Sequence, residues 1–199
     1  MSKLKTDNKE ANMANVLVSK LGSLADSKKS SSWIKSYNGA DAVFKCYEEF
    51  LDKMKNDDEI CNYVSPAPVA MAGYRKGMRK FIDSRMQRQI FSKTICTVGE
   101  DAIRLKLTDD YSLRKTLISF ENAPDEFYSE ILLCKTHILG ASYTSDFAFS
   151  YLMLDKDIAA MHLAVFNLAW KQALREDSHI LQDEKIQKMM DALRGIRKY

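Results

Sequence analysis

The chain has 199 residues, of which 46% are apolar and 29% charged, a composition typical of one soluble globular domain. Only seven glycines and three prolines argue against a turn-rich β-sandwich and against a disordered chain, and they favour helices. Four cysteines lie far apart, and neither they nor the three histidines have the close spacing of a zinc site. We therefore expect buried free thiols in a reducing compartment, and no metal or other cofactor.

The net charge of +3 conceals an uneven distribution along the chain. Residues 1–35 carry a net charge of +4 and residues 73–93 a net charge of +6, so the rest of the chain carries −7. Two concentrated basic segments favour attraction to a polyanion more than the modest total charge suggests.

Residues 1–32 have the pattern of an N-terminal arm followed by a linker. Apolar side chains recur at helical spacing, at Met13, Leu17, Leu21 and Leu24, and the polar, serine-rich segment "ADSKKSSS" follows at 25–32. A short helix with one narrow apolar stripe needs a surface to dock on. That surface is either another copy of the chain, which makes the segment an oligomerisation arm, or the chain's own core.

We expect neither a secretion signal nor a membrane span from the sequence pattern. Acidic residues stand at Asp7 and Glu10 with no apolar run after the N-terminal lysines. The least polar segment, residues 158–174, is too short and too polar to cross a bilayer. We expect a soluble, intracellular protein that is cytoplasmic, or part of a virion if the source is viral.

Helical patterns dominate residues 33–199, which we interpret as one core domain. Asp41 is a candidate N-cap for a helix through residue 54, and Ser65-Pro66 is typical of the start of the helix that runs into residues 73–93. The one β signal is a hairpin over about residues 94–108, where "TICTV" and the alternating "IRLKLT" flank "GEDA".

Four more helices are predicted after this hairpin. The first follows Asp109 or Asp110 to Phe120, the second runs from Pro124 to Gly140, and the last covers residues 183–198. Residues 157–175 are apolar nearly all round, which is typical of a buried central helix. The predicted fold is mainly α: a single helical domain with one small β-hairpin and an N-terminal helical arm.

The segment "GYRKGMRKFIDSRMQRQIFSK", residues 73–93, is the strongest functional lead. On a helical projection its apolar residues form one arc, and Arg75, Lys76, Arg79 and Lys80 form a compact basic cluster on one flank. Gly73 and Gly77 lie near this cluster, where a phosphate backbone or a neighbouring subunit could approach. The candidate nucleic-acid-binding residues are Arg75, Lys76, Arg79, Lys80, Arg85 and Arg88, with Tyr74 as a base-stacking residue. The open alternatives are a solvated helix flank and attachment to a membrane surface.

No catalytic motif accompanies this cluster. The sequence contains neither G-x-S-x-G nor a glycine-rich phosphate loop, and no local frame links a cysteine to a histidine, so we predict no catalytic residues and no enzyme. The layout of terminal helix, hinge, helical core and basic surface resembles viral nucleoproteins and coat proteins in general organisation. We therefore expect a structural protein that self-associates through its arm and binds single-stranded nucleic acid, RNA in particular. The alternative is a helical protein-interaction module or host-directed regulator without nucleic-acid binding.

Overall fold

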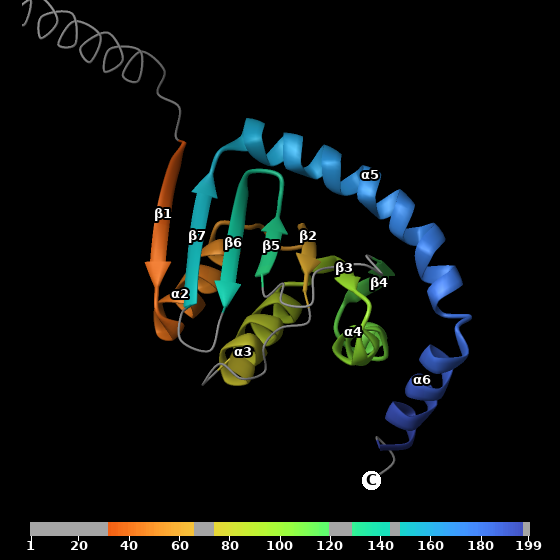
Figure 1. Ribbon diagram of the computed structural model, residues 1–199. Coiled ribbons are helices and arrows are strands. Elements are labelled where there is room, and N and C mark those ends of the chain that lie inside the picture. The colour runs from red at the N-terminus through yellow and green to blue at the C-terminus, as the bar shows by residue number, and fades with distance from the viewer. Residues whose placement is uncertain (1–31, 66–73, 120–128, 144–147, 197–199) are drawn as a thin grey trace, which may run out of the picture. The chain divides into compact units, whose positions relative to one another are not determined.

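A computed structural model describes residues 32–65, 74–119, 129–143 and 148–196, and it contains an α/β fold (Figure 1). The strands are β1 (Trp33–Asn38), β2 (Glu59–Val64), β3 (Phe91–Thr97), β4 (Arg114–Ser119), β5 (Ser129–Leu133), β6 (His137–Tyr143) and β7 (Ala148–Leu154). The helices are α2 (Ala40–Asp52), α3 (Tyr74–Gln87), α4 (Glu100–Lys106), α5 (Lys156–Ile180) and α6 (Glu184–Ile196), with a 3₁₀ turn at Asp109–Tyr111.

All seven strands join one mixed sheet in the order β1-β7-β6-β5-β2-β3-β4. The strands β2, β3 and β4 are parallel, and the helices α3 and α4 form the crossovers between them. The remaining pairs are antiparallel. The prediction of a mainly helical domain with one hairpin is therefore wrong.

Helices cover both faces of the sheet. On one face α2 packs on β6 and β7 through Tyr47 and Phe50, with α3 beside it. On the other face α5 packs on the central strands through Phe166 and Ala173. The helices α4 and α6 close a third apolar cluster over Cys96 and other buried residues of β3 and β4.

Coverage of both faces explains why β5 and β6 looked helical in the sequence. Neighbouring residues Leu132 and Leu133 belong to the clusters on opposite faces, and so do Ile138 and Leu139. A strand buried on both sides is a continuous apolar run without the alternation that identifies a half-buried strand. The predicted helix from Pro124 to Gly140 therefore contains β5 and most of β6, and the helix predicted from Asp109 contains β4.

The predicted hairpin at about residues 94–108 contains one strand and one helix. The first half is β3, but "IRLKLT" lies mostly in α4. Glu100 forms an ion pair with Arg104 at the i, i+4 spacing of a helix, with 2.5 Å between Glu100 Oε1 and Arg104 Nη2. The apolar residues that alternate in sequence also suit a helix, since Ile103 and Leu107 are one turn apart.

The helices α2, α5 and α6 confirm three helical predictions in position, with two corrections. The N-cap of α2 is Gly39, and Asp41 lies in the first turn without capping it. The helix α5 is not buried on all sides, because Met161, Val165 and Leu168 are each more than half exposed. No helix in the described ranges is both long enough and apolar enough to cross a membrane.

The four cysteines match the prediction of buried free thiols. Cys46, Cys61, Cys96 and Cys134 are all unpaired and buried. Burial raises the pKa of the Cys46 thiol to about 11 and that of Cys61 and Cys96 to about 12. The residues of the predicted oligomerisation arm, Met13, Leu17, Leu21 and Leu24, lie outside the described residues.

Candidate nucleic-acid interface

The helix α3 carries most of the predicted binding residues, and its apolar arc packs as the sequence indicates. Met78 and Phe81 are partly buried against the core cluster that α2 forms with the sheet. On the other side of α3, Lys76, Arg79 and Lys80 are exposed to solvent. Tyr74 and Arg75 belong to the first turn, but their side chains lie outside the described part of the structure. The helix ends at Gln87, and Lys93, the last basic residue of the segment 73–93, lies in β3.

Arg85 is an internal structural residue. Its side chain is 2% exposed, and its guanidinium donates hydrogen bonds to three backbone carbonyls, those of Ile90, Ser112 and Leu113. Burial lowers the pKa of this guanidinium to about 10. Arg85 joins α3 to the segments that lead into β3 and β4, and we therefore leave it out of the candidate interface.

Arg88 also serves the fold. Its guanidinium donates to the carbonyls of Leu51 and Met54, at the C-terminal end of α2. The last carbonyls of a helix lack partners within the helix, and a basic side chain there is favoured by the helix dipole. Arg88 is half-buried in this position and keeps its positive charge, but N–H groups on all three of its guanidinium nitrogens are already used within the fold.

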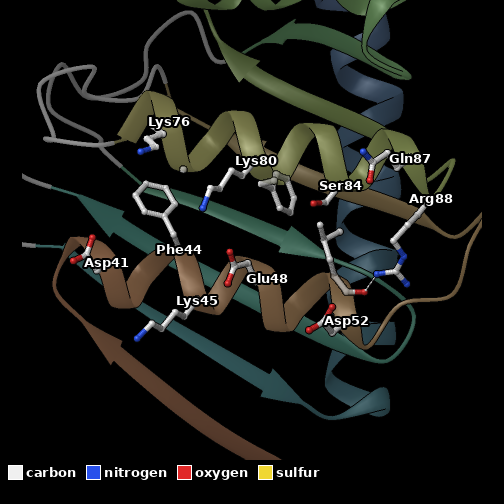
Figure 2. A pocket seen from close by; sticks show the side chains of 13 residues that line it. Asp41, Phe44, Lys45, Glu48, Asp52, Lys76, Lys80, Ser84, Gln87 and Arg88 are labelled. Atoms are coloured by element: carbon white, nitrogen blue, oxygen red, sulfur yellow. Dashed lines mark hydrogen bonds between the residues drawn. The ribbon is translucent and has the colours of Figure 1, made fainter.

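A groove of about 540 Å³ lies between α2 and α3 (Figure 2). From α3 it is lined by Lys76, Gly77, Lys80, Phe81, Ser84 and Gln87, and Arg88 follows at the end of the helix. From α2 it is lined by Asp41, Phe44, Lys45, Glu48, Leu51 and Asp52. Figure 2 shows Lys80 extending from α3 toward α2, whereas Lys45 points away from α3.

The groove charges are divided between the two helices. Lys76 and Lys80 belong to α3, with Arg88 just after its end, whereas α2 contributes Asp41, Glu48 and Asp52 together with one cation, Lys45. Within the described part of the chain, neither Lys76 nor Lys80 has an acidic partner within ion-pair distance. Arg79 pairs with Asp83 at 3.7 Å, but both side chains are mostly exposed, and such a pair is easily exchanged for another anion.

Gly77 is explained by the fold. A Cβ atom added at Gly77 would lie 2.4 Å from Cδ1 of Phe44, so the aromatic ring occupies the space that any larger residue would need. The group that approaches α3 at Gly77 is therefore the Phe44 side chain of α2. The sequence had suggested a phosphate backbone or a neighbouring subunit instead. Gly73, the other glycine of the prediction, lies outside the described residues.

A cysteine and a histidine that sequence reasoning did not connect lie together at the turn between β5 and β6. Cys134 Sγ is 3.0 Å from His137 Nδ1, and His137 Nε2 is 2.9 Å from the carbonyl of Phe50. Both residues are buried, and burial raises the pKa of the thiol and lowers the pKa of the imidazole. These shifts oppose the thiolate and imidazolium forms that a nucleophilic cysteine requires. The pair therefore has the features of a core hydrogen-bond network.

The described residues contain no group of three or more His, Cys, Asp or Glu side chains that could hold a metal ion. The exposed residues that remain together from the sequence prediction are Lys76, Arg79 and Lys80. Phe44 is the addition that the structure makes, because it lines the same groove as Lys76 and Lys80.

No protein-family model matches this chain, and no curated protein has significant sequence similarity to it. Similar solved structures include TrmBL2, an archaeal chromatin protein with a novel mode of DNA binding, at 13% identity and a TM-score of 0.40. NucT from Helicobacter pylori has 8% identity and a TM-score of 0.47, and the phosphatidylserine synthase of Haemophilus influenzae Rd KW20 has 6% and 0.44.

These matches differ in how much of each chain they include. They cover 85%, 69% and 84% of this chain, and 63%, 94% and 46% of the respective structures. This chain therefore spans less than two thirds of TrmBL2 and less than half of the synthase. Likeness at this level of identity and TM-score establishes no shared function.

Proposed function

We propose that this protein binds single-stranded nucleic acid, RNA in particular, through the N-terminal half of α3, and that it does so without catalysing a reaction. The observation that carries the proposal is the exposure of Lys76, Arg79 and Lys80 at i, i+3 and i+4 on one side of α3. Three neighbouring cations on a helix surface are suited to contact successive phosphates, which supply most of the sequence-independent affinity for nucleic acids.

The beginning of α3 supports an anionic ligand. Its first turn contains no acidic residue, although the positive end of the helix dipole favours one there. Lys76 lies instead in this region, where a basic residue is unfavourable for an isolated helix by about 0.3–1 kcal/mol. A bound phosphate would offset this repulsion, and helix N-termini are common sites for phosphates.

Phe44 gives the groove an aromatic surface next to these cations. It lies between α2 and α3, against Gly77 and on the same groove as Lys76 and Lys80 (Figure 2). Bases of single-stranded nucleic acids stack on aromatic side chains beside basic grooves. In the proposal Phe44 takes the stacking role that the sequence assigned to Tyr74.

The carboxylates of α2 limit how the strand can lie. Asp41, Glu48 and Asp52 line the opposite side of the groove and repel phosphates. The strand is therefore expected to keep its backbone on the α3 side. About three phosphate contacts give a slope of about −2 for the logarithm of the binding constant against the logarithm of salt concentration.

The test is a fluorescence anisotropy titration of a labelled oligouridylate, repeated with the matching DNA strand, at several salt concentrations. We expect Lys76→Ala and Lys80→Ala to weaken binding each and to make the salt slope shallower by about 0.7 per removed charge. The matched control is Lys115→Ala, which removes an exposed lysine of β4 away from the groove. No binding at low salt, or an equal effect of Lys115→Ala, would refute the proposal, and preference for the DNA strand would refute its RNA component.

The alternative function, a protein-interaction module, is favoured by one separate observation. Met161, Val165 and Leu168 of α5 are exposed to 60%, 57% and 68%, although large apolar side chains are usually covered. The two functions need different surfaces, so substitution on α3 and on α5 can distinguish them. Self-association through residues 1–32 and an intracellular location stay predictions.

A further inference from the structure

Four of the five large exposed apolar side chains of α5 form one stripe along the helix, which we call the α5 seam, and the fifth, Leu174, lies on another side. The seam consists of Ile158, Met161, Val165 and Leu168, while a different side of α5 is buried on the sheet through Phe166 and Ala173. The helix therefore has an apolar side on the sheet and a second apolar stripe that faces away from the core.

The spacing of the α5 seam is that of a coiled coil. Its residues are separated by three, four and three positions, which are the a and d positions of two heptads. The next a and d positions are Gln172 and Arg175, both exposed and polar. A narrow seam with this spacing suits another helix, and its polar end limits the length of the contact to two heptads.

The α5 seam is also symmetric along the helix. Reversing the direction of α5 about Leu163 places Ile158 on Leu168 and Met161 on Val165, so the seam is superposed on itself. A stripe that matches its own reversed copy suits an isologous contact about a two-fold axis perpendicular to the helix. A parallel pairing makes no use of this symmetry.

The charges beside the seam select the same arrangement. Asp157, Ala164 and Lys171 follow one another at intervals of seven along one edge, and all three are exposed. In an antiparallel pair Asp157 of each copy faces Lys171 of the other, and the two Ala164 residues meet near the axis. In a parallel pair these three positions would face e positions of the partner, so Asp157 and Lys171 would not pair with each other. Within the described residues neither Asp157 nor Lys171 has an ion pair of its own.

We propose that α5 pairs with α5 of a second copy of this chain, antiparallel and about a two-fold axis near Leu163 and Ala164. The partner covers the α5 seam and supplies two reciprocal Asp157–Lys171 ion pairs. Because four side chains from each copy make up the apolar contact, the dimer is a weak one that depends on protein concentration. This surface is separate from the cations of α3, so the dimer and the proposed nucleic-acid binding can fail independently.

The first test uses charge exchange in the full-length protein, with the mass measured by sedimentation equilibrium over a range of concentrations. We expect Asp157→Lys and Lys171→Asp each to shift the protein toward monomer, and the double variant to restore the dimer. Because Asp157 and Lys171 are both exposed, we expect the substitutions to leave the fold unchanged, and circular dichroism is the control for this. A wild-type protein that is monomeric at all concentrations, as it would be if its own chain covered the seam, would overturn the proposal. So would a double variant that behaves like the single ones.

The second test is disulfide formation under mild oxidation. The native cysteines are all buried, so an engineered surface cysteine reacts selectively. We expect Ala164→Cys to give a covalent dimer on a non-reducing gel. The matched control is Ala160→Cys, an exposed position on the same helix that is turned away from the seam. Equal cross-linking of both variants, or of neither, would contradict the antiparallel two-fold pairing.

Discussion

Replacing Gly77 with alanine tests how α2 and α3 pack, and with it the shape of the groove. The new Cβ would lie 2.4 Å from Cδ1 and 2.5 Å from Cγ of Phe44. Because Cγ is also too close, turning the ring about χ2 does not relieve the overlap, and either Phe44 must leave its χ1 rotamer or the two helices must separate. We expect Gly77→Ala to be less stable than a glycine-to-alanine substitution at an open position of a helix.

The magnitude follows from two opposing contributions. Alanine in place of glycine inside a helix stabilises by about 1 kcal/mol. Overpacking of a closed contact costs about 1–3 kcal/mol. Gly77→Ala is therefore expected to change the free energy of unfolding by between zero and a loss of about 2 kcal/mol. At Gly195 in α6 a Cβ would have no neighbouring atom within 4 Å among the described residues, so Gly195→Ala lacks the overpacking cost and is expected to stabilise the protein.

The assay is urea unfolding of Gly77→Ala, Phe44→Ala and the double variant, with Gly195→Ala as the control. Removing the ring removes the overlap, so the two substitutions should couple by about 1–3 kcal/mol in a double-mutant cycle. A difference of 1 kcal/mol corresponds to about 2–4 °C in Tm for a protein of this size. If Gly77→Ala stabilised the protein as much as Gly195→Ala, or if the cycle gave no coupling, the packing of Phe44 on Gly77 would be refuted.

Two further predictions concern the charged residues that hold the fold. Arg85→Met removes the guanidinium donor from three internal carbonyls, of which only that of Leu113 keeps another bond within the described residues, from the Ser92 N–H, and it should cost on the order of 3 kcal/mol in urea unfolding. The exposed Arg79→Met should stay within about 0.5 kcal/mol of wild type. Equal effects of the two would contradict the assignment of Arg85 to the interior. Hydrogen bonds from Lys35 and Tyr37 lower the pKa of Glu49 below its ordinary value of about 4.5. This interaction therefore stabilises the fold above that pH and is lost as the pH falls through the lower folded value, so Glu49→Gln should flatten the loss of stability seen in acid unfolding curves. A Glu49→Gln profile identical to wild type would contradict it.

Patterns that extend over several turns predicted helices well. The stripe of Val43, Tyr47 and Phe50 identified α2 because a 3.6-residue period over about two turns is hard to produce in a strand. The ends were less certain, since Gly39 and not Asp41 is the N-cap. The strands β5 and β6 were missed because they are apolar on both faces, so their sequence has no period to read.

Some features of the candidate site could be predicted from the sequence and others could not. The apolar arc of α3 and the exposure of Lys76, Arg79 and Lys80 follow from the helical period alone. The interior positions of Arg85 and Arg88 do not, because their partners are backbone carbonyls of distant segments, 27 or more residues away in several cases. Backbone acceptors leave no signature in the sequence, so an internal arginine and a binding arginine look alike there.

The sequence by itself determined the helical periods, the free thiols and the concentration of positive charge on one helix. These are local properties, since neighbouring residues on the same helix produce them. Only the tertiary structure decided that the domain is an α/β sheet protein, that Phe44 fills the space at Gly77 and that α5 exposes a second apolar stripe. Each of these depends on which distant segments meet. Burial on both faces of a sheet and a ring packed on a glycine arise from contacts between segments, and no local period encodes them.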